Sequence, residues 1–393
     1  MNLILFDDQS RETLLPLTFT RPAAGLRVGI LTIQEKWEKR TGLSASHLTA
    51  EYLSGKFPME TAEDNLLVNG ALLPDPDLVD RILGLSPGEG LQKDGTILGF
   101  RISGAVSKKV SDHSFNAVEY PGDAHLVDYP WKIFLLNGQE IATDMELLTA
   151  GRKSASLSST VNVLGKENIF VEADFTAEYI TINASSGPVY LGAGSEIMEG
   201  SVIRGPFALC EQSTVKLASK IYGPTTIGPH SKAGGEINNS IILGYSNKGH
   251  DGFLGQAVIG EWCNLGADTN NSNLKNNYTE VKMWSYPANR FIKTGLQFCG
   301  LVMGDHSKCG INTMFNTGTV VGVSANIYGE GFPRNFIPSF SWGGAHGMMV
   351  YRLDKAIETA ERVMERRNIQ LTEDDRLILN HIFETTEKYR KFT

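Results

Sequence analysis

The chain has 393 residues, a formal net charge of -8 and a hydrophobic share of 41%, which is enough apolar material for more than one folded domain. Nonspecific binding to nucleic acid or to an anionic membrane needs a basic field, so the acidic balance argues against both kinds of partner. The four cysteines form no CxxC pair, which argues against a zinc or redox motif and against a disulfide scaffold.

The beginning of the chain carries an apolar run only from Leu3 to Phe6, and Asp7 and Asp8 follow it. A signal peptide needs a longer apolar region behind positive charge. No stretch of the sequence approaches the roughly 20 apolar residues of a membrane span. We therefore expect a cytoplasmic protein that binds no membrane.

Residues 1–155 mix two kinds of local pattern. Leu3 to Phe6 and Asn65 to Asn69 are predicted to be buried strands, and the second of them ends in a turn at Gly70. Ile33 to Arg40 and Asp144 to Leu148 are predicted to be helical. Strands that alternate with helices predict an α/β domain for this part of the chain.

A basic motif follows the first predicted strand. Arg11 precedes the run Pro16-Leu17-Thr18, and Arg21 with Pro22 comes next. This run resembles the signature of sugar-1-phosphate nucleotidyltransferases. The resemblance implies that Arg11 and Arg21 bind the triphosphate of an incoming nucleotide, a role that suits guanidinium groups.

Two features of that family are absent from this sequence. Asp7-Asp8-Gln9-Ser10 stands where the family has a glycine-rich loop, and Ala71 stands near the place of its metal-binding aspartate. Asp75 and Asp77 are the nearest carboxylates that could replace that aspartate, so the metal ligands stay unknown. A degenerate domain without turnover is the alternative to an active nucleotidyltransferase.

The middle of the chain contains an internal repeat with a period of six residues. The first series of the repeat is branched aliphatic throughout: Leu191, Ile197, Ile203, Leu209, Val215, Ile221 and Ile227. Four residues after these positions the side chains are mostly small hydroxyl residues: Ser195, Ser201, Phe207, Ser213, Ser219, Thr225 and Ser231. The period returns in a later series: Met303, Cys309, Phe315, Val321 and Ile327.

A period of six fits a three-sided prism in which one short strand and one corner form each side. Aliphatic side chains then point inward, and glycine serves the corners. Eighteen residues make one coil, so Leu191, Leu209 and Ile227 should stack on one face. The repeat is similar to that of hexapeptide acyltransferases, and this resemblance implies a left-handed parallel β-helix over residues 156–335. A β-solenoid without catalysis is the alternative.

The repeat loses its rhythm between Lys232 and Ile259 and again between Asn270 and Lys293. We expect insertions there that form loops near a binding site. Residues 336–393 are predicted to be a helical tail, because Leu353, Ile357, Ala360 and Met364 have helical spacing. Thr372 with Asp375 resembles a capping box at the start of a second tail helix.

Polar residues concentrate beside the first interruption. Lys248-Gly249-His250-Asp251 precedes Phe253, and Asn264-Leu265-Gly266-Ala267 and Ser272-Asn273-Leu274-Lys275 follow. These segments resemble the acetyltransferase half of the bifunctional enzymes that make UDP-N-acetylglucosamine, most closely a short variant that we associate with Bacteroidetes-like bacteria.

The resemblance implies a role for each of these residues. His250 is implied to be the general base, since histidine titrates near neutral pH. Asn264 and Asn273 are implied to hydrogen-bond the sugar or the acetyl carbonyl, although structural amide ladders or caps are the alternative. Candidates for contact with the sugar or with phosphates are Lys248, Asp251, Phe253, Lys275 and Arg204.

The sequence also departs from the family. Phe253 replaces a common tyrosine, and Glu236 to Ser240 stands where the family has a pair of lysines. Both departures leave the acceptor sugar open. His306 is a second candidate base, but its place within a regular repeat favours a position that faces solvent or a neighbouring subunit.

These observations predict a transferase that uses acetyl-CoA to acetylate glucosamine 1-phosphate and then uses UTP with Mg²⁺ to uridylylate the product. One alternative is a nucleotidyltransferase for another sugar, such as glucose 1-phosphate with dTTP. Another is a scaffold that binds nucleotide sugars without turnover. The family resemblance implies a homotrimer with acyl sites between subunits.

Overall fold

The structure is a computed structural model that describes residues 1–392, and it divides into two compact units. Unit 1 comprises residues 1–14, 20–26 and 31–129. Unit 2 comprises residues 15–19, 27–30 and the chain from residue 130 onward. The division differs from the predicted boundary near residue 155, because the helix that begins at Pro130 and two short earlier segments pack with the repeat region.

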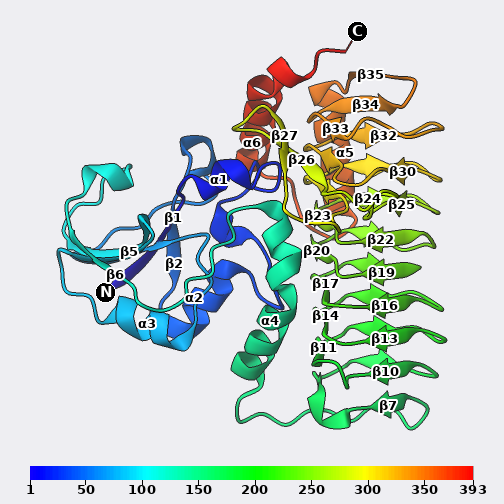
Figure 1. Ribbon diagram of the computed structural model, residues 1–393, viewed down its shortest axis with the longest axis horizontal. Helices are drawn as coiled ribbons and strands as arrows, with labels where there is room; N and C mark the ends of the chain where they lie inside the picture. The colour runs from blue at the N-terminus through cyan, green and yellow to red at the C-terminus, as the bar shows by residue number, and fades with distance from the viewer. Residues whose placement is uncertain (393) are drawn as a thin grey trace. The chain divides into compact units, whose positions relative to one another are not determined.

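Unit 1 contains a mixed six-stranded sheet with helices, so the α/β prediction is confirmed (Figure 1). The strands in spatial order are β2 (Ala45–Leu48), β1 (Asn2–Phe6), β3 (Asp64–Asn69), β5 (Thr96–Ser103), β4 (Glu89–Lys93) and β6 (Asn116–Glu119). The helices are α1 (Ser10–Thr13), α2 (Ile33–Thr41) and α3 (Pro76–Leu83). β1 pairs in parallel with β2 and β3, so the carboxyl ends of these three strands meet at one edge.

The sheet of unit 1 buries alternate side chains on each face, as a strand period of two requires. One face carries a cluster that includes Ile4, Phe6, Leu67 and Phe100. The helix α2 begins at a capping box, in which the Thr32 hydroxyl accepts from the backbone N–H of Glu35 and the Glu35 carboxylate accepts from the N–H of Thr32.

Unit 2 is built around a three-sided parallel β-helix (Figure 1), so this part of the predicted fold class is also confirmed. The first face contains β7 (Asn162–Leu164), β10 (Thr181–Asn183), β13 (Val202–Arg204), β16 (Lys220–Tyr222), β19 (Glu236–Asn238) and β22 (Phe253–Gly255). The second face contains β8 (Ile169–Val171), β11 (Val189–Leu191), β14 (Phe207–Leu209), β17 (Thr225–Ile227), β20 (Ile241–Gly244), β23 (Val258–Glu261), β28 (Val302–Met303), β31 (Val320–Val321) and β33 (Phe336–Ile337). The third face contains β9 (Thr176–Ala177), β12 (Glu196–Ile197), β15 (Thr214–Val215), β18 (Lys232–Ala233), β21 (Asn247–Lys248), β24 (Asn264–Leu265), β29 (Lys308–Cys309), β32 (Asn326–Ile327), β34 (Ser341–Gly344) and the antiparallel β35 (Gly347–Val350).

The interior of the β-helix is the aliphatic stack that the repeat predicts. Leu191 pairs with Leu209 and Leu209 pairs with Ile227, and all three side chains are fully buried. The small residues at the fourth offset are buried too, and their hydroxyls bond to corner carbonyls; the Ser195 hydroxyl, for example, donates to the Gly192 carbonyl oxygen at 2.6 Å. Van der Waals packing and these hydrogen bonds therefore fix the spacing of the coils.

The first predicted interruption is not an insertion, so that prediction is wrong. Strand pairing continues from Lys232 to Ile259, but Thr226 pairs with Ile241 and Lys232 with Asn247, only fifteen positions on. The corners of these coils are shorter than in the regular repeat, and the six-residue period fails for that reason.

The second interruption is an insertion, as predicted. Val258 pairs with Val302, and the extra chain between them holds an antiparallel hairpin of β26 (Lys282–Ser285) and β27 (Arg290–Lys293). Before the hairpin, β25 (Asn270–Asn271) pairs with β30 (Met314–Phe315).

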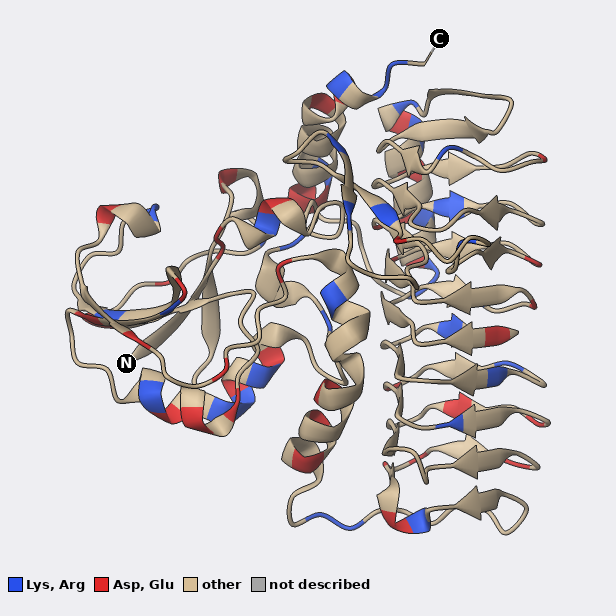
Figure 2. Cartoon of the chain, viewed as in Figure 1, with Lys and Arg blue, Asp and Glu red and all other residues tan. Residues whose placement is uncertain are grey.

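Three helices accompany the β-helix within unit 2. The long helix α4 (Pro130–Thr149) packs along the second face, where Ile141 joins Phe170, Tyr190 and Ala208 in one cluster. The predicted tail helices are α5 (Leu353–Glu365) and α6 (Glu373–Thr385), and α6 begins at the expected capping box. None of the helices within residues 1–392 combines the length and apolar character that a membrane span requires. Cations and anions are both scattered over the elements of each unit (Figure 2).

Truncation of the interior stack should destabilise unit 2. We expect Leu209→Ala to lower the free energy of unfolding by about 2–5 kcal/mol, because Leu209 is fully buried and its loss leaves a cavity. Urea titration followed by circular dichroism measures the change. Leu217→Ala is the matched control, since Leu217 is 61% exposed on the same β-helix; equal losses in the two variants would contradict the stacked interior.

Candidate active site

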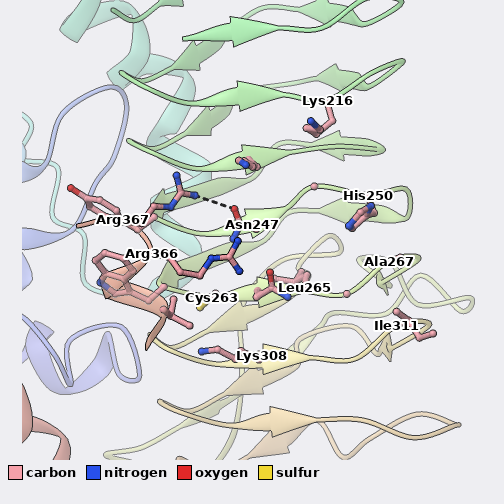
Figure 3. Close-up of a pocket in the computed structure, with 17 residues that line it drawn as sticks. Lys216, Asn247, His250, Cys263, Leu265, Ala267, Lys308, Ile311, Arg366 and Arg367 are labelled. Carbon is pink, nitrogen blue, oxygen red and sulfur yellow. Dashed lines mark hydrogen bonds between the residues drawn. The ribbon is translucent and has the colours of Figure 1, made fainter. Parts of the chain in front are cut away.

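A cavity of about 790 Å³ lies over the third face of the β-helix, next to the C-terminal end of α5 (Figure 3). Its wall combines a histidine, amides, cations and short apolar stretches: Lys216, Lys232, Tyr245, Asn247, Gly249, His250, Trp262, Cys263, Asn264, Leu265, Gly266, Ala267, Lys308, Ile311, Val363, Arg366 and Arg367. Five of these described residues are lysine or arginine, and none is aspartate or glutamate. The cavity is therefore suited to an anionic ligand.

His250 lies at the corner between β21 and β22, where the chain turns from the third face to the first. Gly252 shapes this corner: its φ is +114°, and an added Cβ would lie 2.2 Å from the Thr269 carbonyl oxygen. Glycine meets both demands. The imidazole is exposed on the cavity wall, where it can accept a proton from a ligand.

The floor of the cavity is a row of outward-facing residues on consecutive strands of the third face. Lys232 pairs with Asn247, Asn247 with Asn264, and Asn264 with Lys308. Each precedes an inward-facing residue of its strand, so parallel pairing holds the row in register. The exposed amide of Asn264 and the exposed imidazole of His250 thus share one cavity. Burial lowers the pKa of Lys308 to about 8.

Lys248 does not face this cavity, which corrects the prediction that it contacts phosphate. Its side chain takes an interior position between Ala233 and Leu265, and it is 2% exposed. The Nζ atom donates to the carbonyl oxygens of Gly234 at 2.9 Å and His250 at 2.6 Å. Burial lowers the pKa of Lys248 to about 8, and the nearby Asp251 opposes this shift. Lys248 thus fixes the backbone of the His250 corner from inside.

The other residues predicted for the acyl site lie elsewhere on unit 2. Asp251 is exposed at the corner outside the cavity wall, and Arg204 is exposed on the first face. Phe253 and Asn273 both lie against Gly255, and the Asn273 amide donates to the side chain of Gln256. Lys275 donates to the Glu280 carbonyl oxygen at 2.8 Å, near the inserted hairpin. Of the residues predicted for the acyl site, His250 and Asn264 are therefore the two that line the cavity of a single chain.

Five cations of the cavity were missed by the sequence analysis: Lys216, Lys232, Lys308, Arg366 and Arg367. Lys232 and Lys308 carry a signal that could have been used, because each directly precedes the inward-facing residue of a third-face strand. Arg366 and Arg367 follow the tail helix, and their position over the third face depends on packing that no local pattern encodes.

His306 lies on a different corner, in a ladder of stacked rings. The rings of Tyr245 and Trp262 are 4.4 Å apart and nearly parallel, and His230 and His306 extend the ladder on either side. His306 is not among the residues that line the cavity. The ladder supports the cavity wall at Tyr245 and Trp262, and His250 remains the histidine that faces the cavity.

In unit 1, Arg11 and Arg21 are both buried, at 8% and 7% exposure. The Arg11 guanidinium donates to Glu12 at 2.7 Å and to the Tyr52 hydroxyl at 2.5 Å, and it lies 3.6 Å from Asp7. Arg11 is therefore already charge-paired within the protein. A cavity of about 460 Å³ opens at the carboxyl end of β1, beside the start of β5, and neither predicted arginine lines it.

Asp7 and Asp8, two carboxylates at that edge, are already hydrogen-bonded within the protein. Asp7 accepts from the Ala23 N–H at 2.9 Å and the Thr49 hydroxyl at 2.5 Å, and Asp8 accepts from the Ser10 N–H and the Asn69 amide, both at 2.8 Å. Asp75 caps α3 by accepting from the Leu78 N–H. Within residues 1–392, no group of three or more His, Cys, Asp or Glu side chains is arranged to hold a metal ion.

The N-terminal part of the chain matches a known protein family. Residues 3–153 match the family model described as sugar nucleotidyl transferase. This part is a nucleotidyltransferase-like α/β domain, as predicted, and the chain continues into a parallel β-helix and C-terminal helices.

The curated relatives are transferases. A bifunctional sugar-1-phosphate nucleotidylyltransferase/acetyltransferase of Sulfurisphaera tokodaii is 28% identical over 58% of this chain and 50% of that protein. The bifunctional protein GlmU of Methanocaldococcus jannaschii is 30% identical over 30% of this chain and 26% of its own length. The solved UDP-N-acetylglucosamine acyltransferase of Arabidopsis aligns with 52% of this chain and 76% of its own at 16% identity, with a TM-score of 0.23. The chain thus spans about half the length, or less, of these two curated relatives.

The interior position of Lys248 should make stability depend on pH. Its pKa is about 8 in the folded chain but about 10.4 in an unfolded one, so between these values the unfolded state holds more protons. The contribution of Lys248 to the free energy of unfolding should therefore rise from about pH 8 to about pH 10. Urea titrations of wild type and Lys248→Met should diverge across this window. Lys232→Met, at an exposed position, is the control; a constant difference between wild type and Lys248→Met would contradict the burial of a titrating ammonium.

Proposed function

We propose that unit 2 transfers an acetyl group from acetyl-CoA to the amine of glucosamine 1-phosphate. The observation that carries this proposal is the exposed His250 imidazole on the wall of a cavity that holds five cations and, among its described residues, no carboxylate. A base and a polyanion-binding wall in one cavity suit a phosphorylated thioester donor. The relative from Sulfurisphaera tokodaii is a bifunctional nucleotidylyltransferase and acetyltransferase, which points the same way.

In the proposed reaction, His250 takes a proton from the amine as the amine nitrogen attacks the thioester carbonyl carbon. The new C–N bond replaces the C–S bond, and CoA leaves with the proton as a free thiol. Asn264, whose amide faces the same cavity, would donate to the thioester carbonyl oxygen as negative charge develops there. Lys248 would act as a positioning residue, because it holds the backbone of His250 through one hydrogen bond.

The other predicted residues enter the proposal through a site that is shared between subunits. We propose a homotrimer, in which the exposed first face of one subunit meets a neighbour. This face carries partly exposed apolar side chains, namely Leu164, Val202 and Tyr222, as well as Arg204 and Phe253. Burial of such a row between subunits is favourable. Arg204, Phe253, Asn273, Lys275 and Asp251 would then complete a neighbour's site with contacts that one chain alone does not make.

His250→Ala should abolish acetyl transfer. We expect the release of CoA thiol from acetyl-CoA and glucosamine 1-phosphate to fall by about 10²–10⁴-fold, the usual contribution of a general base. A thiol-reactive dye measures the release. His346→Ala is the control, since His346 is exposed near the β34–β35 turn and pairs with the exposed Glu330. Full activity in His250→Ala with unchanged folding would remove the histidine from the mechanism.

A second candidate function belongs to unit 1. We propose uridylyl transfer from UTP to N-acetylglucosamine 1-phosphate, with Mg²⁺ supplying Lewis-acid chemistry when bound, and the support is the family match over residues 3–153. The carboxylates of Asp7 and Asp8 are already hydrogen-bonded within the protein, so a non-catalytic domain is the competing hypothesis.

Pyrophosphate release decides between these hypotheses. If unit 1 turns over, pyrophosphate should form from UTP only when N-acetylglucosamine 1-phosphate and Mg²⁺ are both present, because the sugar phosphate is the nucleophile. A coupled phosphate assay detects it. Preference for dTTP with glucose 1-phosphate would instead favour another sugar, and no release with either pair would identify a non-catalytic domain.

A further inference from the structure

The C-terminal end of α5 forms one side of the His250 cavity. Val363, Arg366 and Arg367 line it together with residues of the β-helix coils. The helix is held in place by the buried side chains of Ala356, Ala360 and Met364. Figure 3 shows the two arginine side chains directed from the helix toward the third face, beside Asn247.

These two arginines differ from most other arginines of the tail. Three of those form ion pairs with carboxylates: Arg352 with Asp354, Arg362 with Glu358 and Arg376 with Glu361. Within residues 1–392, neither Arg366 nor Arg367 forms an ion pair; the Arg367 guanidinium donates only to the neutral side chain of Asn247, at 3.4 Å. A pair of adjacent guanidinium groups on a cavity wall without carboxylates calls for an anionic partner from outside the chain.

The number of cations that line the cavity indicates which substrate supplies the anionic partner. Lys216, Lys232 and Lys308 add three cations to the two arginines, in a protein whose net charge is -8. A hexosamine 1-phosphate carries a single phosphate, whereas a CoA thioester carries a pyrophosphate and a further phosphate on its ribose. Five cations around one cavity match the donor better than the acceptor, because bidentate arginines and point-charge lysines each neutralise phosphate oxygens.

We propose that Arg366 and Arg367 bind the phosphates of the acyl donor, so that α5 acts as a clamp over the cavity and selects a phosphorylated thioester. The inference rests on the proposed acetyl transfer by unit 2. It makes the helical tail part of the donor site and assigns specificity to residues outside the repeat. Arg367 also contacts Asn247, next in the cavity row to Asn264, so phosphate binding at the helix is linked to the floor that holds the reacting groups.

Equilibrium binding of CoA, measured in the absence of turnover, tests this proposal. Isothermal titration of the full chain should show that CoA binds at least about tenfold more weakly to the Arg366→Met, Arg367→Met double variant than to wild type. The affinity for pantetheine, which lacks these phosphates, should not change. The preference for CoA over pantetheine should therefore shrink by the same factor. Arg362→Met is the matched control, since Arg362 lies one turn earlier and pairs with Glu358 outside the cavity.

Several outcomes would overturn the proposal. CoA affinity unchanged in the double variant would exclude the arginines from the donor site, and equal losses for CoA and pantetheine would indicate a structural role instead. A selective loss of glucosamine 1-phosphate binding would assign them to the acceptor. Thermal melting of each variant shows whether it is folded. Wild type that binds no CoA at all would refute the proposed acetyl transfer itself, an outcome distinct from wild-type binding that the variants leave intact.

Discussion

The narrow interior of the three-sided coil is the constraint on which unit 2 depends. Only aliphatic side chains and small hydroxyl residues fit inside, as at Leu209 and Ser195, and each must lie directly above its equivalent in the previous coil. Because strand side chains alternate, a fixed interior also fixes what lies outside. The inner stack therefore places Lys232, Asn247, Asn264 and Lys308 in one row on the outside of the third face.

Lys248 shows what happens where the constraint is relaxed. The coils around it are shorter by one to three residues, and their corners leave the carbonyl oxygens of Gly234 and His250 pointing inward. An unpaired buried carbonyl is costly, and so is an unpaired buried ammonium. Both costs are avoided when the Lys248 ammonium donates hydrogen bonds to the two carbonyl oxygens. The irregular corner that carries His250 is stable for this reason, and the regular coils have no equivalent.

Unit 1 presents the opposite situation at the edge where a nucleotide would be expected. The loop after β1 satisfies its own polar groups: Asp7 and Asp8 accept hydrogen bonds from the surrounding chain, and Arg11 is paired with Asp7, Glu12 and Tyr52. A site that already pairs its charges with carboxylates gains less from a charged ligand than the cavity of unit 2, whose described lining holds five cations and no carboxylate. The cavity of unit 2 is therefore better suited to bind an anion than the edge of unit 1, although both units resemble transferases.

The sequence by itself determined the strands Leu3 to Phe6 and Asn65 to Asn69, the coil interior and the tail helices, because each follows from a local period or a capping motif that packing then reinforces. It also predicted His250 and Asn264 as site residues, and the structure places both on the wall of one cavity. Only the tertiary structure decided that Lys248 faces inward, that Lys232 begins shortened coils rather than an insertion, and that Arg366 and Arg367 lie over the third face. The physical reason is that these outcomes depend on contacts between groups far apart in the chain. The periodicity of one segment carries no information about the charge or the free space in another segment.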